Sequence, residues 1–229
     1  MKPLFYYVNL DLVNEIGSRQ MLATRSEIRK ASVGCCRSPD RQSFLDRRLI
    51  FFIFMPRINE NYIQFFTAVC TNWLPLLKPD ECKSIIIRAL RYRVQTKQVG
   101  VASFVIMPNH IHIVWRVAAE IKRENFQRDF LKITAKQIID VLKRSDPEIV
   151  KDITVNLKDR KLQVWKRNSM SIDLYNEKFL LQKLNYIHNN PCHPRWDLAP
   201  YPHDYRYSSA KFYHNRENDF EILQHYANI

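Results

Sequence analysis

The sequence predicts an α+β fold, in which an antiparallel sheet carries helices packed on one face. Three observations predict it. Short β-rich runs alternate with segments of helical periodicity, prolines and glycines separate these segments, and no internal repeat is visible. The chain has 229 residues, of which 46% are hydrophobic, and this is enough for one domain with a core of its own, with or without an appendage.

The expected elements follow the order β-α-β-β-α-β-α, which is typical of a ferredoxin-like fold. A helix begins with Pro79 at its first position and acidic residues in its first turn, and it ends before Gly100. Pro108-Asn109 divides the following β-rich stretch into two strands. In chain order we expect a strand over 62–70, the helix from Pro79, strands over 101–107 and 110–117, a helix over 122–143, a strand over 161–166 and a helix over 174–189.

Periodicity and proline also define the later part of the chain. Residues 145–158 have no regular pattern and are expected to be irregular. Pro191 makes continuation of the last helix unfavourable, and a tail rich in proline and tyrosine runs from there to Ile229. The helix over 122–143 is expected to turn four apolar side chains inward: Phe126, Phe130, Ile133 and Ile138.

Residues 1–54 differ from the rest of the chain. They hold two of the three glycines, the Cys35-Cys36 pair and a basic stretch in which neither helical nor strand periodicity is sustained. Two interpretations stand side by side: a poorly patterned N-terminal extension, or a misassigned leader upstream of a natural start at Met55. In both cases residues 55–229 form one domain with a C-terminal tail.

Charge and cysteine content favour a protein that binds a polyanion, and they argue against a membrane-binding or disulfide-stabilised protein. The chain carries 36 lysines and arginines against 23 acidic residues, a net charge of +13, which favours a polyanionic partner. No long amphipathic helix carries all its lysines on one face, as a membrane-binding helix would, and the apolar run 49–55 is too short to span a bilayer. Five cysteines without a CxxC motif predict neither a disulfide framework nor a zinc knuckle. We expect a cytoplasmic protein without membrane contact.

His110 and His112 are candidate metal ligands. Residues two apart on a strand point to the same face, with Cα atoms about 6.5–7 Å apart, so the two imidazoles can share one metal ion. Neutral histidine is the commonest metal ligand. An isolated HxH pattern more often marks two packed or hydrogen-bonded imidazoles, and a tight site needs a third ligand.

The end of the last helix supplies the candidate partners. Tyr186 and Asn190 are four residues apart and share a helix face, so Asn190 is the candidate third ligand. Asn190 could equally be an ordinary helix cap, and Tyr186 a core residue with a satisfied hydroxyl. His188 and Asn189 are rival ligands that point away from Tyr186 by helical geometry. Two histidines, an amide and a phenol suggest metal-assisted attack of the tyrosine on a phosphodiester.

A basic stripe lies on the helix over 122–143. Residues 122–167 hold 13 lysines and arginines against 7 acidic residues, a net charge of +6. Arg128, Lys132 and Lys136 recur at fourfold spacing and form one stripe that could follow DNA phosphates. The alternative is a solvated charged face, which is the commoner reason for such a run.

With these residues in view, the sequence resembles the HUH-type single-tyrosine transposases. It is most similar to the REP-associated branch, which is related to the transposases of the smallest bacterial insertion sequences. The resemblance runs from about Ile63 to Tyr213. Three segments carry it: Val105-Ile-Met-Pro-Asn-His-Ile-His-Ile-Val114, Tyr186-Ile-His-Asn-Asn-Pro191 and Tyr205-Arg-Tyr-Ser-Ser-Ala-Lys-Phe-Tyr213.

The resemblance implies a ferredoxin-like catalytic domain, a divalent metal (Mg²⁺ or Mn²⁺) on His110 and His112, Tyr186 as the nucleophile and Asn190 as the polar ligand. It also implies hairpin-forming single-stranded DNA as the substrate, a 5′-phosphotyrosine intermediate and a homodimer. In some members the tyrosine serves the partner's metal site. The chain departs from the family after Pro191, where it continues with Cys192-His-Pro-Arg-Trp-Asp-Leu198.

Two other functions stay open on the sequence. The first is a domesticated, non-cleaving protein that binds structured DNA or RNA, for which a sheet and positive charge suffice. Its binding would be independent of metal and unaffected by His110→Ala. The second is a metal-dependent nuclease that uses water, in which Tyr186→Phe would stay active.

Overall fold

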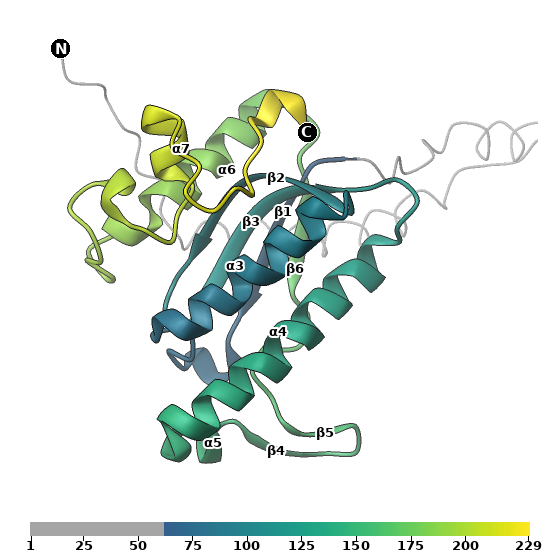
Figure 1. The fold of residues 1–229 in the computed structure, drawn as a ribbon, viewed down its shortest axis with the longest axis vertical. Coiled ribbons are helices and arrows are strands. Elements are labelled where there is room, and N and C mark those ends of the chain that lie inside the picture. Colours follow the sequence, from purple (N-terminus) through teal and green to yellow (C-terminus); the bar gives the residue numbers. More distant parts are fainter. Residues whose placement is uncertain (1–61) are drawn as a thin grey trace, which may run out of the picture. The chain divides into compact units, whose positions relative to one another are not determined.

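A four-stranded antiparallel sheet lies at the centre of residues 62–229, which are the residues that the computed structural model describes (Figure 1). The predictions for residues 1–54 and for a start at Met55 lie outside the described residues. The strand order is β2-β3-β1-β6, and each neighbouring pair is antiparallel. The strands are β1 (Gln64–Val69), β2 (Val99–Ile106), β3 (His110–Val117) and β6 (Met170–Asp173). The predicted α+β class and antiparallel sheet are confirmed.

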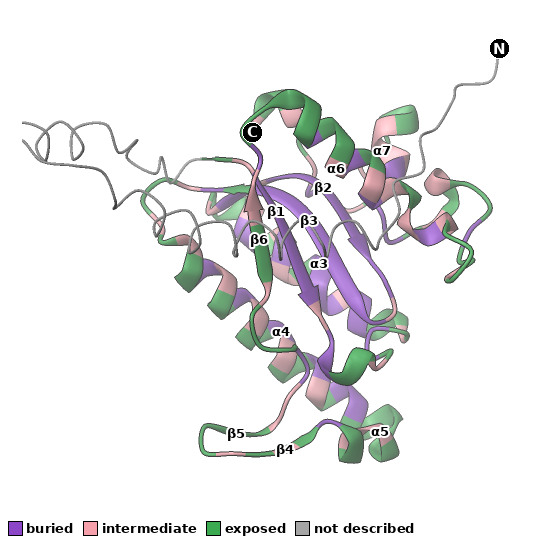
Figure 2. Ribbon diagram, turned by 180° about the vertical axis from the view of Figure 1, so that it is seen from behind, coloured by how far each residue is buried: buried purple, intermediate pink, exposed green. Residues whose placement is uncertain are grey.

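Alternation along β3 divides the core into two parts. Its odd-numbered residues from Ile111 to Val117 face a layer that contains α3 (Asp80–Gln95) and α4 (Arg123–Ser145). Its even-numbered residues face α6 (Glu177–Asn189), which packs on the opposite side. Thus α3 and α4 share one face, as expected. α6 covers the other face, whereas the sequence predicted the helices on one face only. Figure 2 shows the central strands buried between these layers.

The segment from residue 145 to residue 166 differs from the prediction. Residues 145–158 are not irregular: they contain α5 (Pro147–Asp152) and β4 (Thr154–Leu157). The side chain of Asp146 caps α5 by accepting a hydrogen bond from the amide of Ile149. The strand expected over 161–166 is β5 (Arg160–Leu162), which pairs with β4 in a separate two-stranded sheet.

The fourth strand of the main sheet is β6, which the prediction missed. β6 has four residues and little apolar character, so it carries a weak strand signal. Tertiary contacts hold it in place: Asp173 pairs with Gln64 of β1 and forms a salt bridge of 2.7 Å with Arg123 of α4. Two details of the helices were also wrong. Pro79 is the N-cap of α3 rather than its first residue, and Ile133 is 45% exposed on α4.

The tail after α6 packs along the outer strand of the sheet. The amide of Ile106 donates to the carbonyl of Tyr207 at 2.9 Å, and the amide of Ser209 donates to the carbonyl of Phe104 at 2.9 Å. A short helix, α7 (Ala210–Asn215), follows these bonds. The tail therefore covers the free edge of β2, where an unpaired strand would otherwise be exposed. None of the helices within residues 62–229 is long and apolar enough to span a bilayer.

Candidate active site

His110 and His112 lie side by side on the α6 face of β3. His110 is paired with Val69 of β1 and His112 with Thr67, and the centroids of the two rings are 4.8 Å apart. Only 7% of His110 and 5% of His112 is exposed. The strand therefore brings the two imidazoles together as the sequence predicts, in a nearly dry environment.

Asn109 determines which ring nitrogen of His110 carries the proton. The side-chain amide of Asn109 donates from Nδ2 to the carbonyl of Trp73 at 3.1 Å, so its Oδ1 atom faces His110. Oδ1 can only accept, and the 2.6 Å contact therefore requires His110 to carry its proton on Nδ1. The Nε2 atom of His110 then keeps its lone pair, as a metal ligand needs.

His112 has a similar support from β1. Its Nδ1 atom lies 2.8 Å from the hydroxyl of Thr67, which can accept the Nδ1 proton and leave Nε2 as the ligating atom. Burial, with a smaller contribution from the nearby charge of Arg195, lowers the pKa of His110 to about 4. Burial also lowers the pKa of His112 well below its usual value. Both rings are therefore neutral at pH 7, the state in which histidine binds a metal ion.

Tyr186 reaches the histidines from α6. Asn176 caps this helix by accepting a hydrogen bond from the amide of Phe179 at 2.8 Å, and Leu180, Leu184 and Ile187 bury its apolar face. The ring centroid of Tyr186 is 5.2 Å from that of His112. The predicted nucleophile and the predicted ligand pair thus share one site, although they are 74 positions apart in the sequence.

Two nearby side chains, Asn190 and Lys183, surround Tyr186. Burial raises its pKa, and the side chain of Asn190 opposes this by hydrogen bonding to the hydroxyl. The ammonium of Lys183 lies 5.9 Å from the centroid of Tyr186 and 4.9 Å from that of Phe65.

Asn190 is the remaining candidate ligand. It is the C-cap residue of α6, and its side chain contacts the hydroxyl of Tyr186. Within residues 62–229 there is no group of three or more histidine, cysteine, aspartate or glutamate residues that could hold a metal ion. A metal on the two histidines would therefore depend on this amide or on oxygen atoms of the substrate.

The rival ligands point elsewhere. The Nε2 atom of His188 lies 2.9 Å from the hydroxyl of Ser209 and 3.3 Å from that of Ser103, in a polar cluster beneath the tail. Asn189 is exposed and donates to the carbonyl of Asn185 at 2.8 Å. Neither side chain faces the histidine pair.

The segment after Pro191 covers His110. Trp196 lies with its ring centroid 5.6 Å from that of His110, and Arg195 stacks on Trp196 at 5.5 Å. Neither these contacts nor the contact of Thr67 with His112 could be predicted from the sequence, because they depend on the packing of distant segments. Asn109 is the exception, because it directly precedes His110 in the sequence and could have been expected to lie next to it.

The basic stripe lies away from this site. Arg128, Lys132 and Lys136 are exposed on α4, and α4 packs on the opposite face of the sheet from the histidines. The cations near the histidines and the tyrosine are instead Lys183 and Arg195.

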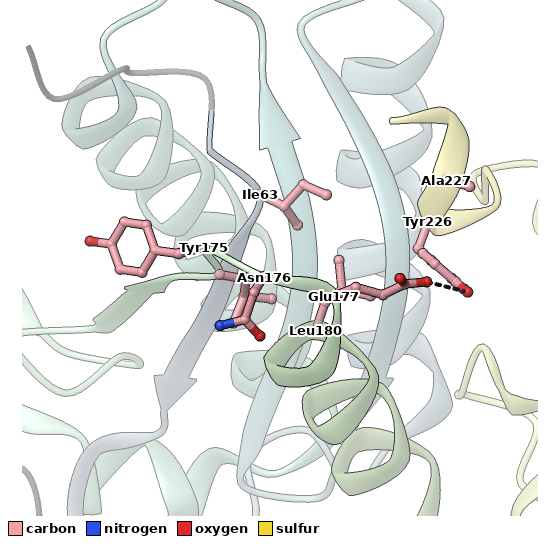
Figure 3. Close-up of a pocket in the computed structure, with 8 residues that line it drawn as sticks. Ile63, Tyr175, Asn176, Glu177, Leu180, Tyr226 and Ala227 are labelled. Carbon is pink, nitrogen blue, oxygen red and sulfur yellow. Dashed lines mark hydrogen bonds between the residues drawn. The ribbon is translucent and has the colours of Figure 1, made fainter. Parts of the chain in front are cut away.

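An apolar hollow lies at the other end of α6 (Figure 3). Its volume is about 290 Å³, and Ile63, Leu174 and Leu180 form part of its wall. The hydroxyl of Tyr226 donates to Glu177 across it at 3.4 Å. Glu177 is nine residues from Tyr186, about 13 Å along the helix, so this hollow is separate from the histidine site.

No family model and no curated protein matches the chain. Among solved structures, it is similar to a REP-associated tyrosine transposase bound to a REP hairpin, with 18% identity, a TM-score of 0.48 and coverage of 72% of this chain and 86% of that one. It is also similar to a protein of Deinococcus radiodurans R1 named as a transposase, with 13% identity, a TM-score of 0.38 and coverage of 56% and 90%. Both are transposases by name, the class that the sequence motifs resemble. At this degree of similarity, the function has to be argued from the site.

Proposed function

We propose that this protein is a metal-dependent, DNA-cleaving and rejoining enzyme of the transposase type, in which Tyr186 attacks a phosphodiester of single-stranded DNA. The observation that carries the proposal is the approach of Tyr186 to His112, with ring centroids 5.2 Å apart across the interface between α6 and the sheet. A structural role for Tyr186 in the core would not explain why two neutral histidines, each with its Nδ1 atom hydrogen-bonded to a neighbour, lie beside it.

The residues present fit a divalent metal ion. His110 and His112 would hold it through their Nε2 atoms, with Asn190 as the third ligand, and the set suits Mg²⁺ or Mn²⁺ together with oxygen atoms of the DNA. When bound, the metal would supply charge stabilisation at the scissile phosphate. Asn109 and Thr67 would orient the two rings, as hydrogen-bonded neighbours of metal ligands commonly do.

The chemical step conserves the phosphodiester. The hydroxyl oxygen of Tyr186 bonds to phosphorus as the bond from phosphorus to the 3′-oxygen breaks, and the phenol proton is transferred in net terms to that 3′-oxygen. The products are a 5′-phosphotyrosine and a free 3′-hydroxyl. The reverse attack by a 3′-hydroxyl rejoins DNA without a nucleotide cofactor. The hydrogen bond from Asn190 favours the phenolate, against the effect of burial.

The substrate and assembly follow from charge and from the family resemblance. A net charge of +13 supports a polyanionic substrate, and hairpin-forming single-stranded DNA from the flanks of the gene is the proposed one. A homodimer is the proposed assembly. Residues 55–229 are the proposed catalytic domain with its tail.

The test is covalent capture of DNA. Single-stranded DNA from the flanks of the gene, labelled at its 3′ end, is incubated with the protein and Mn²⁺ and analysed on a denaturing gel. The 3′ fragment stays on the tyrosine, so a labelled, protease-sensitive adduct is expected. DNA labelled at its 5′ end should instead release a labelled fragment with a free 3′-hydroxyl.

Tyr186→Phe should abolish the adduct, and Tyr175→Phe is the matched control. Tyr175 lies just before α6 and is 70% exposed, so its loss should leave the adduct unchanged. An adduct that persists in Tyr186→Phe contradicts the assignment of the nucleophile. Cleavage without any adduct in the wild-type protein indicates a nuclease that uses water, and DNA binding without cleavage indicates the non-cleaving alternative.

A further inference from the structure

A polar hollow of about 440 Å³ lies where β1 ends, outside the histidine and tyrosine cluster. Its walls are two segments, 71–73 and 163–168. A backbone hydrogen bond of 2.7 Å joins them, from the amide of Thr71 to the carbonyl of Val164, and a second of 2.7 Å joins the amide of Lys166 to the carbonyl of Val69 at the end of β1. The two walls are therefore held at a fixed separation.

Trp73 stands exposed at this hollow. It is 55% exposed, whereas Trp115 and Trp165 are buried. Asn72 and Trp73 are consecutive residues with positive φ, of 50° and 58°, a conformation that is unfavourable for side chains other than glycine. The amide of Trp73 donates to the carbonyl of Cys70 at 3.1 Å, and its carbonyl accepts from Asn109. Strained backbone of this kind is typical of ligand-binding positions.

Two cations line the same hollow as Trp73. Lys166 and Arg167 line the hollow, and both are exposed. The guanidinium of Arg167 lies 3.6 Å from the carboxylate of Asp159, which also forms a salt bridge with Arg160. Within residues 62–229 no carboxylate lies within salt-bridge distance of Lys166. An exposed aromatic ring next to cations is the arrangement that binds single-stranded nucleic acid, because the ring stacks on a base and the cations pair with phosphates.

The hollow is linked directly to His110. Asn109 joins the two, through bonds of 3.1 Å to the carbonyl of Trp73 and 2.6 Å to the imidazole of His110. We propose that the hollow is a subsite for single-stranded DNA, in which a base stacks on Trp73 while Lys166 and Arg167 bind the adjoining phosphates. As the subsite for the strand that Tyr186 attacks, it rests on the proposed function. It would hold the strand beside the scissile phosphate.

Binding is measured on the full chain in the Tyr186→Phe background with a chelator present, so that no cleavage occurs. The probe is a fluorescein-labelled oligothymidylate, followed by fluorescence anisotropy, with quenching of tryptophan fluorescence as a second signal. Trp73→Ala is expected to weaken binding by roughly tenfold or more and to remove most of the quenching, and Trp73→Phe should restore part of the affinity. Replacing Lys166 and Arg167 together by glutamine should reduce the slope of log affinity against log salt by about 1.4.

Matched controls separate the subsite from general effects. Tyr92→Ala removes another exposed ring, which is 60% exposed on α3, and replacing Lys97 and Lys178 by glutamine removes the same charge elsewhere. Both should leave affinity for the oligothymidylate within about twofold. Thermal unfolding of each variant checks that the fold is kept.

The proposal is overturned if Trp73→Ala binds as tightly as its parent, or if Tyr92→Ala weakens binding equally. The outcome is independent of the capture experiment. If the wild-type protein forms the covalent adduct but Trp73→Ala binds the oligothymidylate as tightly as its parent, the subsite proposal is wrong and the proposed function stands. Binding that depends on Trp73 without any adduct retains a single-strand binding site and removes the proposed chemistry.

Discussion

Asn109→Ala tests whether His110 is held as a metal ligand. The substitution removes the acceptor at 2.6 Å from His110 Nδ1 and the donor at 3.1 Å to the carbonyl of Trp73. Loss of such a support typically lowers metal affinity by about 10- to 100-fold, which is about 1.4–2.8 kcal/mol. Each lost hydrogen bond should also lower the free energy of unfolding by about 1 kcal/mol, because Asn109 is only 4% exposed.

The assay is a calorimetric titration of metal-free protein with Mn²⁺, together with the Mn²⁺ concentration that gives half of the maximal covalent adduct. Asn109→Ala should raise both, and excess Mn²⁺ should restore the adduct. Asn109→Asp keeps an acceptor for the Nδ1 proton of His110 and should recover most of the affinity. Asn215→Ala, an exposed asparagine on α7, is the control.

An Asn109→Ala protein that binds Mn²⁺ as tightly as the wild-type protein would show that Asn109 does not support His110 as a metal ligand. Loss of the adduct at every Mn²⁺ concentration, in a protein that stays folded, would also contradict this role, because a support of the metal ligand should act through metal affinity.

Two further predictions concern pH and salt. Burial lowers the pKa of His110 and of His188 to about 4, from about 6.5 in the unfolded chain. Between these two pH values the unfolded chain binds more protons than the folded one, so the free energy of unfolding decreases as the pH is lowered from about 6.5 to about 4. At pH 5 each group should cost the metal-free protein about 2 kcal/mol, and in urea unfolding His188→Gln should show a shallower loss between pH 7 and pH 5 than the wild-type protein. Replacing Arg128, Lys132 and Lys136 by glutamine should reduce the slope of log affinity against log salt for hairpin DNA by about 2–3, and an unchanged slope would assign the stripe to a solvated face.

Much of the sheet could be predicted because its strands carry their own signals. β1 and β3 are apolar and lie between turn residues, so their existence and bounds follow from local pattern. β6 could not be found this way. Its four residues resemble a loop, and it is a strand because Gln64 and Arg123 hold Asp173 at the edge of the sheet. β5 had a stronger local pattern and still pairs outside the main sheet, because strand pairing is decided by which segments meet rather than by propensity.

The candidate site divides in the same manner. His110 and His112 share a face because a strand alternates with period two, and Asn190 lies beside Tyr186 because a helix repeats after about four residues. These relations are local, so the sequence alone could place each pair. Only the tertiary structure put α6 on the histidine face of the sheet and α4 on the other. This packing brings Tyr186 and Lys183 to His112 and leaves the predicted basic stripe on the far side.

The supports of the histidines also belong to the tertiary structure. Thr67 reaches His112 from a neighbouring strand, and the carbonyl of Trp73 orients Asn109 against His110. Such contacts join residues far apart in the chain, and no spacing rule relates them. The sequence therefore determined which side chains could form a phosphodiester-transfer site. Packing decided how they are oriented, protonated and buried, because these properties depend on neighbours that only the fold brings together.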